Sequence, residues 1–133
     1  MADRLTATEA EIAWAAGLFE GEGSCFVSRR QDRPVVRIGM TMRMADRDVV
    51  ERFHRIVGVG QFTGPIVHIR KTDGKRLKDV FEWRTGSWHV INDLYVLFKP
   101  WLADRRRGQF ELALTRGRPK SPVRRRTCQE VTV

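Results

Sequence analysis

Apolar residues recur with two different periods along this chain, and the periods predict its helices and strands. Residues 35–44, VVRIGMTMRM, alternate between apolar and polar or small positions, which predicts a half-buried strand. Residues 47–57 carry apolar side chains at helical spacing, with Asp46 before them as a plausible helix N-cap. The same criteria predict further helices over residues 8–22, 87–98 and 102–115, and further strands over residues 24–31, 61–71 and 77–85.

The order of these elements predicts an α+β fold. Two successive hairpins with a helix between them form one antiparallel four-stranded sheet, with the helices on one face. Thr72-Asp73-Gly74-Lys75 is typical of a hairpin turn, and Gly64-Pro65 predicts a bulge or an edge position for the third strand. Residues 1–115 are expected to form a single domain. Residues 116–133 are basic and lack apolar periodicity, so we expect a disordered tail.

The first predicted helix is not an ordinary amphipathic helix. Its bulky apolar side chains share one side of a projection at about 100° per residue, and a small-residue stripe lies nearly opposite: Ala10, Ala13, Gly17 and Gly21. Each glycine inside a helix costs roughly 1 kcal/mol relative to alanine, so the stripe needs a packing reason, such as a second backbone very close by.

The end of this helix carries a local conflict. Glu20 and Glu22 fall in its last turn, directly before Gly23 as the predicted C-terminal stop. Acids at that end oppose the helix dipole. A conflict of this kind indicates a functional site rather than a scaffold.

Composition narrows the class of partner. The chain has 133 residues and a net charge of +9, which favours a polyanion, with nucleic acid first and an acidic membrane surface second. No segment approaches the roughly 20 apolar residues of a membrane span, and the polar N-terminus is unlike a secretory signal. Cys25 and Cys128 lie far apart and indicate free thiols in a reducing compartment. We therefore expect a cytoplasmic, nucleoid-associated or organellar protein that is not secreted.

Residues 15–23, AAGLFEGEG, resemble the LAGLIDADG motif of homing endonucleases. Gly17, Leu18 and Gly23 match the motif, Ala15 replaces its leucine, and glutamates at 20 and 22 replace its two aspartates. The predicted order over residues 8–115 is similar to the αββαββα fold of that family. Only one copy of the motif is present, and single-motif members are homodimers that cut pseudo-palindromic DNA.

The resemblance implies a set of site residues. Two copies of the helix would pack across a two-fold axis, and the residues expected at this dimer interface are Ala13, Gly17, Glu20 and Gly21. Glu22 matches the acid that binds a divalent metal, here expected to be Mg²⁺. A polar position after the second strand falls at Asp46, for which a plain N-cap role is equally open. A basic position near the last helix falls in residues 105–107, with Arg105 favoured, so the expected catalytic residues are Glu22, Asp46 and Arg105.

The polar face of the sheet is expected to read DNA sequence, because a two-stranded ribbon fits the major groove. The predicted contacts are Ser28, Arg30, Arg37, Thr41 and Arg43 from the first hairpin, and Gln61, Thr63, His68 and Arg70 from the second. In the last strand, the alternation predicts Lys78, Glu82 and Arg84 on this face and Leu77, Phe81 and Trp83 toward the core.

Three functions are compatible with these patterns. The first is a homodimeric, Mg²⁺-dependent, site-specific DNA endonuclease, of the kind that drives intron or intein mobility. The second keeps the fold without cleavage, as a sequence-specific DNA-binding protein or an RNA-splicing maturase. The third is a basic RNA-binding or ribosome-associated protein, which leaves the small-residue stripe unexplained.

Overall fold

A computed structural model describes residues 6–29 and 36–119 of the chain. In chain order the elements are α1 (Glu9–Glu22), β1 (Gly23–Arg29), β2 (Val36–Met44), α2 (Arg47–Val57), β3 (Gln61–Ile66), β4 (Val80–Thr85), α3 (Trp88–Phe98), the 3₁₀ turn η2 (Lys99–Trp101) and α4 (Asp104–Arg116). The predicted α+β succession is confirmed. Arg30, Cys128 and residues 120–133 of the predicted disordered tail lie outside the described residues. The first residue of that predicted tail, Arg116, instead belongs to α4, so the helix extends one residue further than expected.

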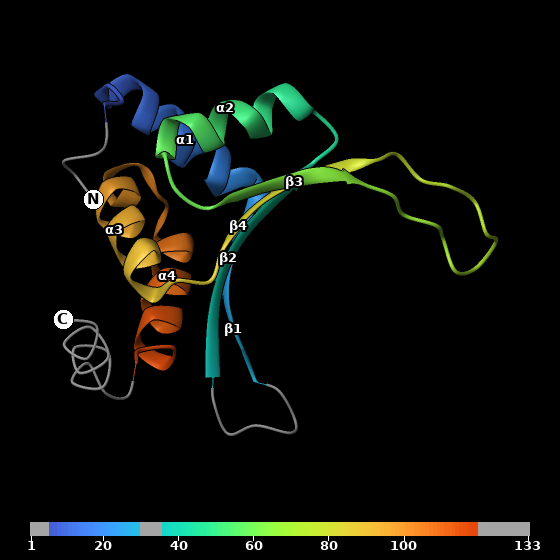
Figure 1. Ribbon diagram of the computed structural model, residues 1–133. Coiled ribbons are helices and arrows are strands. Elements are labelled where there is room, and N and C mark those ends of the chain that lie inside the picture. The colour runs from blue at the N-terminus through green and yellow to red at the C-terminus, as the bar shows by residue number, and fades with distance from the viewer. Residues whose placement is uncertain (1–5, 30–35, 120–133) are drawn as a thin grey trace, which may run out of the picture.

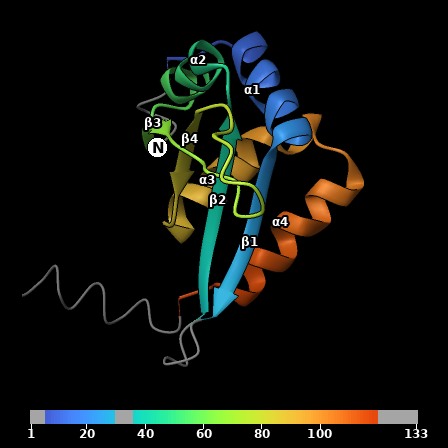
Figure 2. The same ribbon diagram turned by 90° about the vertical axis from the view of Figure 1, so that its right-hand side faces the viewer.

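The strands form one antiparallel sheet in the order β1-β2-β4-β3. All four helices lie against one of its faces, as Figures 1 and 2 show, and no described helix covers the other face. We call this uncovered side the polar face. None of the helices in the described part of the chain has the length and apolar character needed to cross a membrane.

The alternation in β2 sets which side chains face the helices. Ile38, Met40 and Met42 are buried beneath them, whereas Arg37 and Arg43 are exposed on the polar face. This is the pattern that a period of two predicts when one face of a strand is covered.

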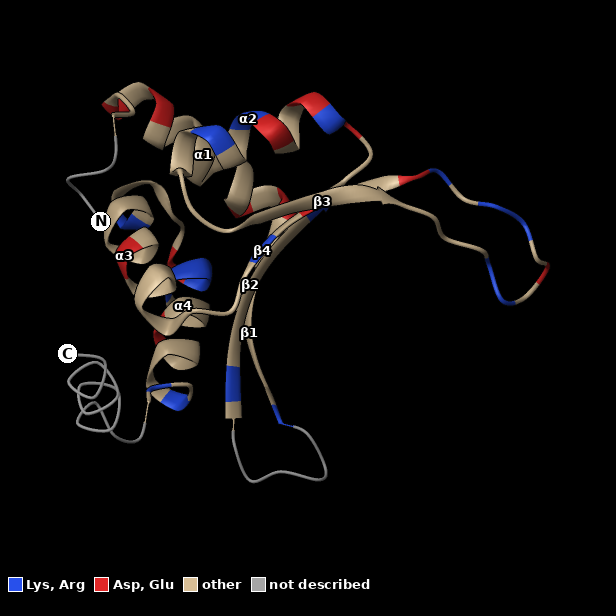
Figure 3. Ribbon diagram, viewed as in Figure 1, with Lys and Arg blue, Asp and Glu red and all other residues tan. Residues whose placement is uncertain are grey.

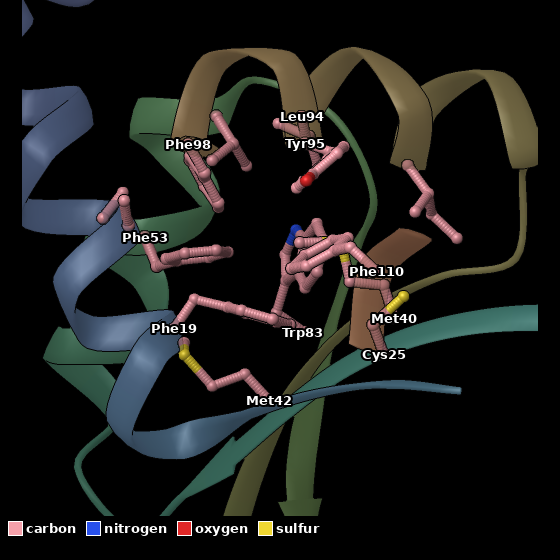
Figure 4. Close-up of a cluster of buried hydrophobic side chains, with 14 of the residues drawn as sticks. Phe19, Cys25, Met40, Met42, Phe53, Trp83, Leu94, Tyr95, Phe98 and Phe110 are labelled. Carbon is pink, nitrogen blue, oxygen red and sulfur yellow. The ribbon is translucent and has the colours of Figure 1, made fainter. Parts of the chain in front are cut away.

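The core is built around one aromatic ring from α1. Phe19 is fully buried, and its ring centroid lies 6.4 Å from that of Phe53 in α2, 6.3 Å from that of Phe98 in α3 and 5.5 Å from that of Phe110 in α4. Figure 4 shows these rings converging above Met42 and Trp83 of the sheet. Phe19 therefore contacts side chains from each of the other three helices.

The second hairpin is shorter than predicted. β3 ends at Ile66 and β4 begins at Val80, and residues 67–79 form an arm that leaves the body of the domain (Figure 1). A single bridge, Ile69 to Arg76, joins its two sides. Leu77, predicted to face the core, is 39% exposed, because the arm extends past the helices and has no core to contact. The expected irregularity at Gly64-Pro65 is confirmed by a register shift between Thr63 and Ile66.

Gly23 ends α1 for a reason that differs from the predicted one. Its backbone is extended, with φ −94° and ψ 171°, so it is not the left-handed glycine that commonly stops a helix. A Cβ atom on Gly23 would instead overlap the ring of Phe19. The glycine is required because the central ring of the core occupies the space of a side chain.

Gly23→Ala should therefore destabilise the domain, by about 1–3 kcal/mol as in other overpacked cores. Gly108→Ala is the matched control, since a Cβ atom at that exposed position in α4 meets nothing within 4 Å. It should stabilise the domain by about 0.5–1 kcal/mol through helix propensity. Urea unfolding of both variants measures the difference, and equal effects of the two substitutions would contradict the role given to Phe19.

Candidate nucleic-acid interface

The local sequence of α1 fixes where its acidic end lies. Thr8 and Glu11 form the predicted capping box, in which the Thr8 hydroxyl accepts from the Glu11 amide at 3.1 Å and the Glu11 carboxylate accepts from the Thr8 amide at 2.9 Å. The helix then continues to Glu22, whose side chain is exposed directly before β1. By helical periodicity Glu22 falls on the bulky apolar side of α1, but its side chain stays out of the core because the helix ends at this residue.

The small-residue stripe of α1 is open to solvent in the single chain. Gly17 and Gly21 are exposed, and a Cβ atom added at either would meet no atom within 4 Å. Packing among residues 6–29 and 36–119 therefore gives no reason for glycine at these two positions, in contrast to Gly23. Ala13, the third small residue predicted at the interface, is partly exposed.

Glu20 joins α1 to the start of α4. Its carboxylate accepts a hydrogen bond from the backbone amide of Ala103 at 2.8 Å, and Ala103 is the N-cap residue of α4. The backbone carbonyl of Glu20 accepts a second bond, from Arg106, at 2.7 Å. The first acid of the motif thus has an intrachain role that the sequence did not reveal, and its place in a dimer interface stays a prediction.

Arg106, beside the favoured Arg105, is the buried member of the basic cluster. It is 6% exposed and also donates to Gln109 at 2.6 Å, while its guanidinium lies 5.6 Å from the centre of the Phe19 ring. Burial raises the pKa of the neighbouring Cys25 thiol to about 12, which the charge of Arg106 only partly opposes. Cys25 is thus a neutral, buried thiol.

The three predicted catalytic residues lie at one end of the domain. Gly23, at the start of β1, pairs with Met42 near the end of β2, so Asp46 follows β2 at the end of the sheet where Glu22 precedes β1. Asp46 occupies the N-cap position of α2 but makes no capping hydrogen bond through its side chain. Arg105 is exposed in the first turn of α4, which Glu20 ties to the end of α1.

Strand register arranges the predicted contact residues in rows across the polar face. Ser28 pairs with Arg37, and Arg84 lies between Thr41 and Gln61. In the next row Glu82 lies between Arg43 and Thr63, and its carboxylate is 2.8 Å from the Arg43 guanidinium. Glu82 is 7% exposed, so it is a buried acid within a basic row and holds Arg43 in place.

His68 and Arg70 lie on the arm and not on the sheet. Both are exposed beyond the end of β3. Lys and Arg positions recur along the arm, where they colour the ribbon blue in Figure 3. The basic residues of the arm are Arg70, Lys71, Lys75, Arg76 and Lys78.

Phe26 also lies on the polar face, although it is not among the contacts predicted from the sequence. It is 40% exposed and pairs with Gly39 of β2. Its position, two residues before Ser28, could have indicated this face by alternation alone.

Comparisons with solved structures identify the architecture. The homing endonuclease I-CvuI, in complex with its target in the presence of calcium, is similar at a TM-score of 0.59 and 19% identity, over 80% of this chain and 65% of that chain. The LAGLIDADG meganuclease I-AabMI, bound to uncleaved DNA, has a TM-score of 0.57 and 24% identity, over 77% of this chain and 34% of that chain. The intron-encoded homing endonuclease I-CeuI, complexed with DNA, has a TM-score of 0.59 and 12% identity, over 85% of this chain and 57% of that chain.

The fold is that of the LAGLIDADG homing endonucleases. Neither a protein-family model nor a curated protein matches the sequence. The chain spans less than two thirds of the length of each of these three LAGLIDADG-fold structures. At identities below 25% the likeness establishes the fold, which confirms the predicted resemblance at the level of the fold.

Arg106→Met should destabilise this LAGLIDADG fold by about 2 kcal/mol, because the Glu20 carbonyl and the Gln109 side chain lose a charged donor. Arg105→Met, on the exposed neighbour, should change the free energy of unfolding by less than about 0.5 kcal/mol. Chemical denaturation distinguishes the two variants. Equal losses would mean that the buried hydrogen bonds of Arg106 do not hold α1 and α4 together.

Proposed function

We propose that this chain is a homodimeric, divalent-metal-dependent, site-specific DNA endonuclease. The observation that carries the proposal is the form of α1, which combines an open small-residue stripe with an exposed carboxylate, that of Glu22, at its end. The stripe suits close packing against a second copy, since glycine lets two helix backbones approach. The same packing would bring two Glu22 carboxylates together.

The donor chemistry fits Mg²⁺ only if two copies share the site. Among residues 6–29 and 36–119, no three His, Cys, Asp or Glu side chains are grouped closely enough to hold a metal ion. Mg²⁺ keeps several of its waters and is commonly bound by one or two carboxylates together with substrate phosphates. One Glu22 from each copy, with the scissile phosphates, meets that requirement.

The residues around α1 then take different tasks. A Mg²⁺ ion supplies charge neutralisation and a water of lowered pKa. Glu22 binds the ion, and Arg105 balances phosphate charge without removing a proton, since an arginine stays charged in proteins. Asp46 has a carboxylate free of capping bonds, suited to holding a water. Glu20 keeps the end of α1 fixed against α4 through Ala103.

The polar face supports DNA as the substrate. Its rows of arginine, serine, threonine and glutamine are groups that bind base edges and phosphates in the major groove. The three structures compared are described in complex with their target or with DNA. The match to only 34% of I-AabMI leaves room there for a second such unit, which a second copy of this chain would supply.

Glu22→Gln should abolish cleavage while leaving DNA binding in place. Sequencing the cut ends of a randomised duplex library incubated with Mg²⁺ measures the first, and a gel-shift titration measures the second. Glu9→Gln, an exposed change at the opposite end of α1, should cut like the natural chain. Identical cleavage by the natural chain and Glu22→Gln would refute the assignment, and specific binding with no cleavage by either would select the DNA-binding alternative.

Gly17→Leu should convert the dimer to a monomer without unfolding the chain, because a Cβ atom there meets no described atom of its own chain within 4 Å and the longer side chain would fill the space of a second helix. Light scattering should show the mass halved. Gly108→Leu adds the same side chain at another open position and should leave the mass unchanged. A natural chain that is monomeric at all concentrations would overturn the dimer.

A further inference from the structure

Phe26 is an apolar side chain in a basic and polar surface. It is 40% exposed on the polar face, where it lines an open hollow of about 510 Å³ together with Ser28, Arg37, Thr41, Gln61 and Arg84. A single exposed phenylalanine is unremarkable in itself. Its position at the wall of a hollow bordered by arginines is the feature that points to a ligand.

The strand opposite is shaped to receive this ring. A Cβ atom on Gly39 would lie 2.6 Å from Cζ and 2.9 Å from Cε2 of Phe26, so the far edge of the ring rests on the glycine. Gly39 is buried although it belongs to the polar face, because Phe26 covers it. Glycine under an aromatic ring lets the ring lie on the sheet instead of standing away from it, and this fixes an apolar surface at a defined height.

The surrounding charges select the occupant of the hollow. Arg37 and Arg84 border it and favour a polyanion. β1 and β2 are paired antiparallel strands, and a two-stranded β-ribbon is an element that enters the major groove of DNA. In that groove the 5-methyl group of thymine is the apolar feature of a base-pair edge. RNA lacks this methyl group, and the major groove of its A-form helix is too deep and narrow for side chains to read.

We propose that Phe26 is a specificity-determining residue that reads the 5-methyl group of a thymine in each half-site of the DNA target. This inference rests on the proposed function, since it requires duplex DNA on the polar face. Ser28, Arg37 and Arg84 contact the flanking bases or phosphates. The Phe26 ring makes an apolar contact with the 5-methyl group, which only a methylated pyrimidine carries.

A uracil scan tests the proposal on the intact chain. The natural chain first selects its site from a randomised duplex library, and each thymine of that site is then replaced by uracil, which keeps the pairing edge and lacks the methyl group. At one thymine in each half-site the replacement should weaken binding by about fourfold, the factor expected for one buried methyl group. In Phe26→Ala the same replacement should have no effect.

Two further variants keep the result interpretable. Phe26→Leu retains an apolar side chain and should keep part of the preference for thymine, so a loss of folding in Phe26→Ala does not decide the outcome. Val96→Ala removes another exposed apolar side chain, 65% exposed on α3, and should show the full preference. Circular dichroism confirms that each variant is folded.

The outcomes separate this inference from the function beneath it. A selected site at which uracil is tolerated everywhere, or at which Phe26→Ala and the natural chain lose equally, overturns the role of Phe26 and leaves the proposed function standing. A library from which the natural chain enriches no sequence overturns both.

Discussion

The packing of one ring, that of Phe19, is the constraint on which the rest of the domain depends. It contacts aromatic side chains of α2, α3 and α4 and lies near the Arg106 guanidinium. It also occupies the space of a side chain at Gly23, where α1 gives way to β1. Close-packed protein interiors transmit displacements rather than absorb them. The direction of α1 relative to the sheet, and therefore the position of Glu22, is set by this contact.

Two kinds of glycine follow from that arrangement, and they carry different information. Gly23 is required by its own chain, because Phe19 fills the adjacent space. Nothing in the described part of the chain requires glycine at Gly17 or Gly21, although each carries a cost in helix stability. An exposed glycine that destabilises its helix and has no packing partner among the described residues is consistent with the proposed contact to a second chain. This contrast, more than the motif letters, supports a second copy of the chain against α1.

Side chains that are exposed on the polar face are restrained by their cross-strand neighbours. Cross-strand rows set neighbours for each side chain, and Glu82 restrains Arg43 by an ion pair at 2.8 Å. An arginine held in one conformation loses less entropy when it binds a planar acceptor. The arm extends the basic surface beyond the sheet, so its Lys and Arg side chains are suited to contacts along a phosphate backbone.

The sequence by itself determined the element order, the face of β2 that is buried and the anomaly in α1, because these depend on local periodicity and on the cost of glycine. Through the resemblance of residues 15–23 it also predicted Glu22, Asp46 and Arg105 as catalytic residues, a role that stays a prediction. It did not reveal that the second hairpin leaves the sheet at Ile66, that Glu20 and Arg106 join α1 to α4, or that Phe26 rests on Gly39. Those features were decided by tertiary structure, because each depends on which distant segment of the chain lies alongside. The alternation of a strand is the same whether or not a helix covers it, so the sequence pattern alone does not show where the sheet loses its helix layer.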